Sequence, residues 1–151
     1  MDPYVELKEI DKENIEEVLA LEVSAQQRDF VQTPAVSLAK AWAYKQTAFP
    51  FAVYAQDMLV GFIMLGYYEQ KDQYTVWQFL IDARYQHKVY GRAALALGIQ
   101  FLRDRFHAAE VYLGVKFQNS IAKKLYASAG FVETGEKTDT AVEMKLVIGD
   151  T

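Results

Sequence analysis

The length, composition and charge of the chain exclude several classes of protein. Of its 151 residues, 52% are hydrophobic, 14% aromatic and 24% charged, which is typical of a globular domain and not of a disordered chain. We expect a single domain over residues 1–151, because this length is ordinary for one hydrophobic core. Sixteen basic residues against twenty acidic ones give a net charge of −4. This balance argues against nucleic acid as a partner, since phosphate binding needs a basic surface.

The cysteine and histidine content limits the chemistry further. The chain has no cysteine, which excludes disulfides, thiolate nucleophiles and thiolate metal sites. Its two histidines, His87 and His107, lie too far apart in the sequence for a typical histidine-based metal site, so we expect no metal. The first residues lack a basic, apolar secretory segment, and no apolar run approaches membrane-spanning length. We therefore expect a cytoplasmic protein without a membrane partner.

The predicted elements begin with a strand over residues 5–10, where apolar and polar residues alternate. Asp11 is the expected N-cap of a first helix, and Thr33 with Pro34 marks the start of a second. The remaining pattern predicts strands over 51–55, 58–68 and 74–81, a helix over 91–106, a strand over 110–115, a helix over 120–129, and two short strands between 131 and 148.

This order, β-α-α-β-β-β-α-β-α-β-β, predicts an α/β (α+β) fold in which a mixed sheet of about seven strands is flanked by about four helices. The hairpins of the first half predict antiparallel pairing. The alternation of strands and helices in the second half predicts parallel pairing there.

A strand ending near Asp82 is predicted to run through a basic turn straight into the helix that begins at Gly91. Unpaired backbone N–H groups at a helix start point outward together, and the helix dipole adds positive potential. Lys88 and Arg92 add charge, and Gly91 permits close backbone approach. The turn is therefore a candidate seat for a pyrophosphate.

The segment from Asn119 to Phe131 is the second candidate for chemistry. Asn119 is a suitable N-cap, and Gly130 ends the helix before the next strand. Tyr126 lies in mid-helix, where its side chain can reach over the end of a neighbouring strand. A phenol has a pKa of about 10, so it is protonated at neutral pH and can donate a proton to a leaving group.

The Gln-x-x-x-x-Gly-Arg turn of residues 86–92, together with Asn-x-x-Ala-x-x-Leu-Tyr-x-x-x-Gly-Phe at 119–131, resembles the GNAT superfamily of N-acetyltransferases. Within that superfamily the chain is most similar to the bacterial spermine/spermidine (diamine) acetyltransferase branch. The residues that carry this second resemblance are 77–82, 90–94, 130–136 and 27–31.

The resemblance implies acetyl-CoA as the cofactor and assigns roles by position. The backbone of Phe79, Leu80 and Ile81 would pair with the pantetheine arm. Asn119 and Tyr126 would lie near the thioester, with Tyr126 protonating the departing thiolate. The remaining cofactor-binding residues implied are Gln86, His87, Lys88, Val89, Tyr90, Gly91, Arg92 and Lys123.

Val89 departs from the family turn, which has glycine at that position. A β-branched residue fits badly if the position needs a positive φ, so this departure also allows a weakly catalytic acyl-CoA-binding regulatory module. For the base that accepts the amine proton, the candidates are Asp82, Glu22 and Glu69, and the sequence does not choose among them.

The amine acceptor is also left open by the sequence. A polyamine such as spermidine or spermine is the leading candidate, and an aminoglycoside-like or peptide N-terminal amine is the alternative. Family members are often dimers, so a homodimer is compatible with the resemblance.

Overall fold

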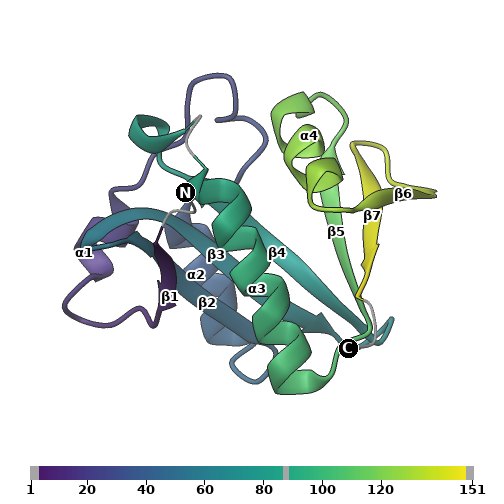
Figure 1. Cartoon of the computed structure of the whole chain (residues 1–151), viewed down its shortest axis with the longest axis horizontal. Helices are drawn as coiled ribbons and strands as arrows, with labels where there is room; N and C mark the ends of the chain where they lie inside the picture. The colour runs from purple at the N-terminus through teal and green to yellow at the C-terminus, as the bar shows by residue number, and fades with distance from the viewer. Residues whose placement is uncertain (1–3, 87–88, 149–151) are drawn as a thin grey trace.

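The computed structural model describes residues 4–86 and 89–148, and its elements follow the predicted order (Figure 1). Within this part of the chain, no helix is both long and apolar enough to cross a membrane. The elements are β1 (Val5–Lys8), α1 (Ile15–Leu19), α2 (Pro34–Ala43), β2 (Ala48–Ala55), β3 (Met58–Tyr68), β4 (Gln73–Ile81), a 3-10 turn (Ala83–Tyr85), α3 (Tyr90–Phe106), β5 (Glu110–Lys116), α4 (Ser120–Ser128), β6 (Val132–Lys137) and β7 (Ala141–Val147).

Two of the three predicted helix caps are confirmed. The Thr33 hydroxyl accepts a hydrogen bond from the Val36 N–H at 3.3 Å, and the Asn119 side chain accepts one from the Ala122 N–H at 3.2 Å. The prediction of Asp11 as the cap of α1 is wrong, because Asn14 occupies that position. Asp11 instead shapes the preceding turn, since its carboxylate accepts the N–H of Asn14 at 3.2 Å.

The seven strands form one sheet in the order β1-β2-β3-β4-β5-β7-β6. The predicted parallel pairing is correct for β4 with β5 and wrong for the last strands. There β7 lies between β5 and β6 and is antiparallel to both. The alternation of strand and helix predicted the direction of β6 relative to β5, but it does not specify which strand of the final hairpin takes the place beside β5.

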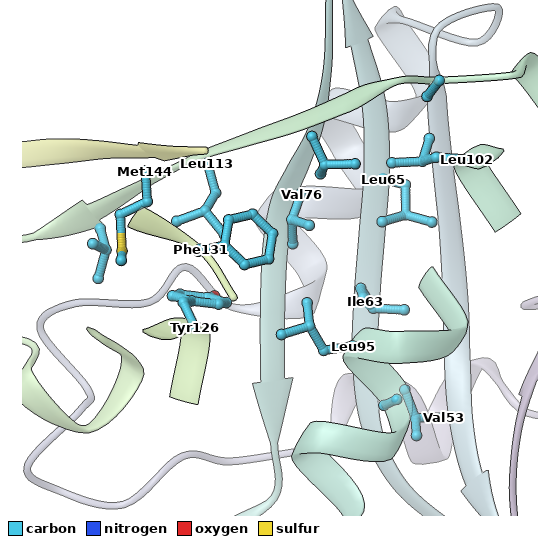
Figure 2. Packing of buried hydrophobic residues seen from close by; sticks show 14 of the residues in the cluster. Val53, Ile63, Leu65, Val76, Leu95, Leu102, Leu113, Tyr126, Phe131 and Met144 are labelled. Carbon is cyan, nitrogen blue, oxygen red and sulfur yellow. The ribbon is translucent and has the colours of Figure 1, made fainter. Parts of the chain in front are cut away.

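Buried side chains form one cluster on each face of this sheet, and β3 contributes to both. Ile63 and Leu65 belong to the cluster under α3 and α4, which is drawn in Figure 2. Phe62 and Met64 belong to the cluster under α1 and α2. Because alternate residues of a strand point to opposite faces, a strand covered by helices on both sides is apolar throughout.

A β-bulge interrupts β4 at Trp77. Met64 of β3 pairs with Gln78 and Leu65 pairs with Val76, which leaves Trp77 as an extra residue. A bulge inverts the alternation of side chains and increases the local twist. Accordingly Val76 packs in the cluster under α3 and α4, whereas Leu80, four residues later, packs in the other cluster. The bulge lies where β4 turns away from β5.

Candidate active site

The candidate site is created by the divergence of β4 and β5. These strands pair only at Tyr74–Val111 and Thr75–Tyr112, and Figure 1 shows them separating from there toward α4. Beyond Thr75, the one strand paired with β4 in the described part of the chain is β3. Backbone groups on its other edge are therefore available to an extended ligand, as at other exposed strand edges.

A cleft of about 820 Å³ occupies this divergence. Its lining comes from residues 23–32, the second half of β4, the turn into α3, the end of β5 and the first turns of α4. Val23 and Val31 pack in the cluster under α1 and α2, whereas Leu125 and Tyr126 pack in the cluster under α3 and α4. Residues of both faces thus line one cleft, which passes between the two strands from one face of the sheet to the other.

The turn into α3 and the start of α4 form what we call the cofactor wall, made of Gln86, Val89, Gly91, Arg92 and Asn119, all of which line the cleft. Val89 is the N-cap of α3, with φ −78°. The position therefore does not require a positive φ, and its β-branched side chain is not strained there. The wall combines a helix start with a basic side chain, an arrangement that binds phosphate groups.

Not every predicted cofactor residue belongs to this wall. Phe79, Leu80 and Ile81 line the cleft. Tyr90 is directed to Tyr85 and the core, with ring centroids 6.5 Å apart. Lys123 is half-buried on α4 and does not line the cleft. Expected residues outside the described part of the chain are His87 and Lys88.

Tyr126 is buried on α4 and also lines the cleft. Its ring meets that of Phe131 edge to face, as Figure 2 shows, and the ring centroids are 5.8 Å apart. Burial raises the pKa of the Tyr126 phenol well above its usual range, because the charged phenolate is poorly solvated there. The side chain therefore remains protonated at neutral pH and can act as a proton donor.

Asp82 does not line the cleft, and its side chain is engaged in other contacts. It is 3% exposed and accepts hydrogen bonds from the Arg84 N–H and Nε, both at 2.9 Å, and from the Glu22 N–H at 3.1 Å. Burial by itself would raise the pKa of Asp82, but the bonds from Arg84 and Glu22 outweigh it and lower that pKa. A carboxylate held in this way is a poor proton acceptor at neutral pH.

The other two candidate bases are no better placed. The Glu22 side chain is exposed and absent from the lining of the cleft. Glu69 lies in the turn between β3 and β4, at the end of β4 remote from the cleft. In residues 4–86 and 89–148, no three His, Cys, Asp or Glu side chains lie close enough to hold a metal ion.

The residues that sequence reasoning missed come from the irregular segment before α2 and from β4 and β5. Asp29 and Phe30 line the cleft, as do Trp77, Gln78 and Lys116. Among the described lining residues, Asp29 is the only carboxylate. Its segment has no helical or strand periodicity. The one available signal was the match of residues 27–31 to the polyamine acetyltransferase branch.

Comparisons with known proteins identify the family of the chain. A model of the acetyltransferase (GNAT) family matches residues 14–131. The spermine/spermidine N(1)-acetyltransferase of Bacillus subtilis is 33% identical, over 87% of this chain and 90% of that protein. Among solved structures, a spermidine N-acetyltransferase from Vibrio cholerae in complex with CoA and spermine is similar with a TM-score of 0.73 at 18% identity, over 95% of each chain.

A second solved structure, the PaiA N-acetyltransferase from Thermoplasma acidophilum in complex with coenzyme A, has the same TM-score of 0.73. It is 16% identical and covers 96% of this chain and 99% of that one. At these identities the two structures establish the fold alone, whereas the family model and the Bacillus relative establish descent. The chain belongs to the GNAT family of acetyltransferases and is an N-acetyltransferase that uses acetyl-CoA.

Proposed function

We propose that this enzyme acetylates a primary amine of a polyamine such as spermidine or spermine, with Tyr126 as the general acid. The observation that carries the proposal is a single cleft that joins the two faces of the sheet, with Tyr126 and Asp29 both in its lining. The name of the Bacillus relative, a spermine/spermidine acetyltransferase, supports the choice of substrate.

Acetyl-CoA would bind on the side of the cleft that belongs to α3 and α4. The unpaired edge of β4 at Phe79–Ile81 suits the amides of a pantetheine arm, because backbone N–H and C=O groups bind such a chain as they bind another strand. The start of α3 with Arg92 suits the pyrophosphate, and His87 and Lys88 remain expected contributors. Lys123 is left out of the proposal, since it does not line the cleft.

The proposed reaction is a direct transfer. The neutral amine nitrogen attacks the thioester carbonyl carbon, the carbon–sulfur bond breaks, and the Tyr126 hydroxyl gives its proton to the leaving sulfur. Backbone N–H groups near Leu80 would stabilise the negative charge that develops on the carbonyl oxygen. We assign the surplus amine proton to water in the open cleft, because neither Asp82 nor Glu22 lines it.

The amine would enter from the side of the cleft formed by residues 23–32. A polyamine carries further ammonium groups besides the one that reacts. A carboxylate attracts such cations, and aromatic faces bind them as well. Asp29 with Phe30 and Trp77 supplies both kinds of group. An aminoglycoside-like or peptide amine shares only part of this chemistry.

The substrate is tested by measuring thiol release from acetyl-CoA with spermidine, spermine, an aminoglycoside and a peptide with a free N-terminus. We expect kcat/KM to be at least about tenfold higher for the polyamines, the discrimination that one well-placed charge contact supplies. A preference for another amine would replace the polyamine assignment. Acetyl-CoA binding by calorimetry without thiol release from any amine would support the regulatory alternative. Light scattering on the same preparation tests the expected homodimer.

The role of Asp29 is tested by Asp29→Asn. We expect the KM for spermidine to rise about tenfold, because an interaction between two opposite charges is lost, while the Kd for acetyl-CoA stays within about twofold. Asp57→Asn is the matched control, since it removes one negative charge from the exposed turn between β2 and β3. An unchanged spermidine KM in Asp29→Asn would remove this residue from the acceptor site.

A further inference from the structure

The segment that supplies Asp29 to the cleft has no regular structure to hold it in place. Residues 20–33, here called the acceptor segment, join α1 to α2 without helix or strand. Its internal backbone hydrogen bonds are two turns, from Gln27 N–H to Ser24 O at 3.0 Å and from Phe30 N–H to Gln27 O at 2.9 Å. Turns of this kind do not fix the position of a segment relative to the sheet.

Three contacts tie the acceptor segment to β4 and the turn that follows it. The Ala83 N–H donates to the Glu22 carbonyl at 2.7 Å, and the Glu22 N–H donates to Asp82 Oδ2 at 3.1 Å. Farther along, the Gln86 amide donates to Gln27 Oε1 at 3.0 Å. The third contact is a bond from the amide of Gln78 to Oε1 of Gln32, at 3.3 Å.

The first of these contacts depends on the most buried polar group of the three. This group is the Asp82 carboxylate, which accepts hydrogen bonds from Arg84 on one side and from the acceptor segment on the other. It also caps the 3-10 turn that leads to Gln86. Since the partner in the acceptor segment is the Glu22 N–H, the Glu22 side chain is not needed for the contact. A buried carboxylate with several donors holds those donors in place more strongly than an exposed one.

We propose that Asp82 is a positioning residue that holds the acceptor segment against the end of β4, and thereby places Asp29 in the cleft. It acts through the Glu22 N–H and does not touch the substrate. The effect of this contact on the amine substrate rests on the proposed function, but the placement of the segment does not. One of the tests below therefore requires no substrate.

The first test is limited proteolysis by trypsin. Arg28 is exposed in the middle of the acceptor segment, so the bond from Arg28 to Asp29 reports on how firmly the segment is held. We expect Asp82→Asn to speed cleavage there about tenfold, because the amide nitrogen repels the donors that the carboxylate bound. Cleavage after Arg103, in α3, is the internal measure of global unfolding and should not change. Equal rates at Arg28 in both proteins would overturn the proposal.

Glu22→Gln is the matched control. It changes a carboxylate at the other end of the same contact but leaves the backbone N–H in place, so we expect trypsin cleavage and turnover like those of the wild type. If Asp82→Asn does not fold, Arg84→Met decides. Arg84 has 69% of its side chain exposed, so its replacement should leave the fold intact. The substitution removes the hydrogen bond from Arg84 Nε to Asp82 Oδ1. Cleavage after Arg28 should then increase about threefold, and an unchanged rate would overturn the proposal.

The second test separates positioning from proton transfer. In Asp82→Asn we expect the KM for spermidine to rise about tenfold while kcat at saturating amine stays within about threefold and the Kd for acetyl-CoA within about twofold. A fall in kcat of about a hundredfold with an unchanged KM would instead identify Asp82 as the base. If spermidine proves not to be a substrate, only this second test is lost, and proteolysis at Arg28 still decides the proposal.

Discussion

The cofactor wall and the acceptor segment are two sides of one cleft, but they are built differently. The cofactor wall consists of the first turns of α3 and α4, which are helices with local signals such as the Asn119 cap. The acceptor segment has no such signals and depends on single hydrogen bonds to β4 and the turn that follows it, the shortest of them 2.7 Å long. A wall made of helix ends should resist single substitutions, whereas a segment held by a few side chains should not.

The largest effect is expected on turnover, at Tyr126, the proposed general acid, which lies between the cofactor wall and the acceptor segment. Tyr126→Phe removes the proton donor but keeps the ring that packs on Phe131. We expect turnover to fall about a hundredfold or more, as for the loss of a general acid, with affinities on both sides of the cleft unchanged. Steady-state kinetics and calorimetry measure this, with Tyr4→Phe, an exposed phenol, as the control. Turnover that is unaffected across the pH range would remove Tyr126 as the acid.

A smaller effect should be confined to the cofactor wall. A Cβ added at Gly91 would lie 3.6 Å from Leu125 Cδ2 and 3.7 Å from Ile81 Cγ1, which is ordinary contact. Gly91→Ala should therefore stabilise α3, by up to about 1 kcal/mol, yet weaken acetyl-CoA binding several-fold if phosphate approaches this backbone closely. Thermal unfolding and calorimetry measure the two effects.

Ala96→Gly is the control for Gly91→Ala, because it changes helix stability at an exposed position of the same helix. It should lower the melting temperature without changing the affinity for acetyl-CoA. Unchanged or tighter binding in Gly91→Ala would mean that the pyrophosphate does not lie against Gly91, and the spermidine KM should be unchanged in either variant.

The smallest effect is expected at acidic pH, on the stability that Asp82 contributes by holding the acceptor segment. Because the pKa of Asp82 is lowered in the folded protein, its contribution to stability is present above the unfolded pKa of about 3.9 and is lost as the pH falls through the lower folded value. The difference in melting temperature between wild type and Asp82→Asn should therefore narrow below about pH 4. This change in melting temperature should be small, because the Arg84 side chain is exposed and solvent weakens its interaction with Asp82.

Melting curves of both proteins between neutral pH and pH 3 measure this narrowing. Asp104→Asn is the control, since Asp104 is exposed and pairs with the neighbouring Arg103 at 3.4 Å. A difference between wild type and Asp82→Asn that stays constant down to pH 3 would mean that Asp82 does not contribute as a charged group.

Much of the fold was predictable because its signals are local. Thr33 with Pro34, Asn119 and Gly130 mark helix ends through backbone bonds or dihedral angles that involve only near neighbours. The prediction failed where two local solutions compete, as at Asp11 and Asn14, which both shape the start of α1. It also failed for the place of β7, which is decided by contacts between distant strands.

The candidate site divides in the same way. The turn from Gln86 to Arg92 was predicted from the sequence as a phosphate seat, because a strand, a turn and a helix start follow one another there. Asp82 was identified as a chemical candidate in the same stretch. Its burial and its bond to Glu22, sixty positions away, assign it a structural contact instead, and no local pattern contains that information.

The sequence by itself therefore determined the order of elements, the helix starts after β4 and β5, and the position of Tyr126 in a helix, because hydrophobic period and capping act over a few residues. Only the tertiary structure decided that β4 and β5 separate after two paired residues, that Trp77 forms a bulge, and that Asp29 enters the cleft. These features depend on strand register and on contacts between remote segments, whose energies are set by the packed molecule as a whole.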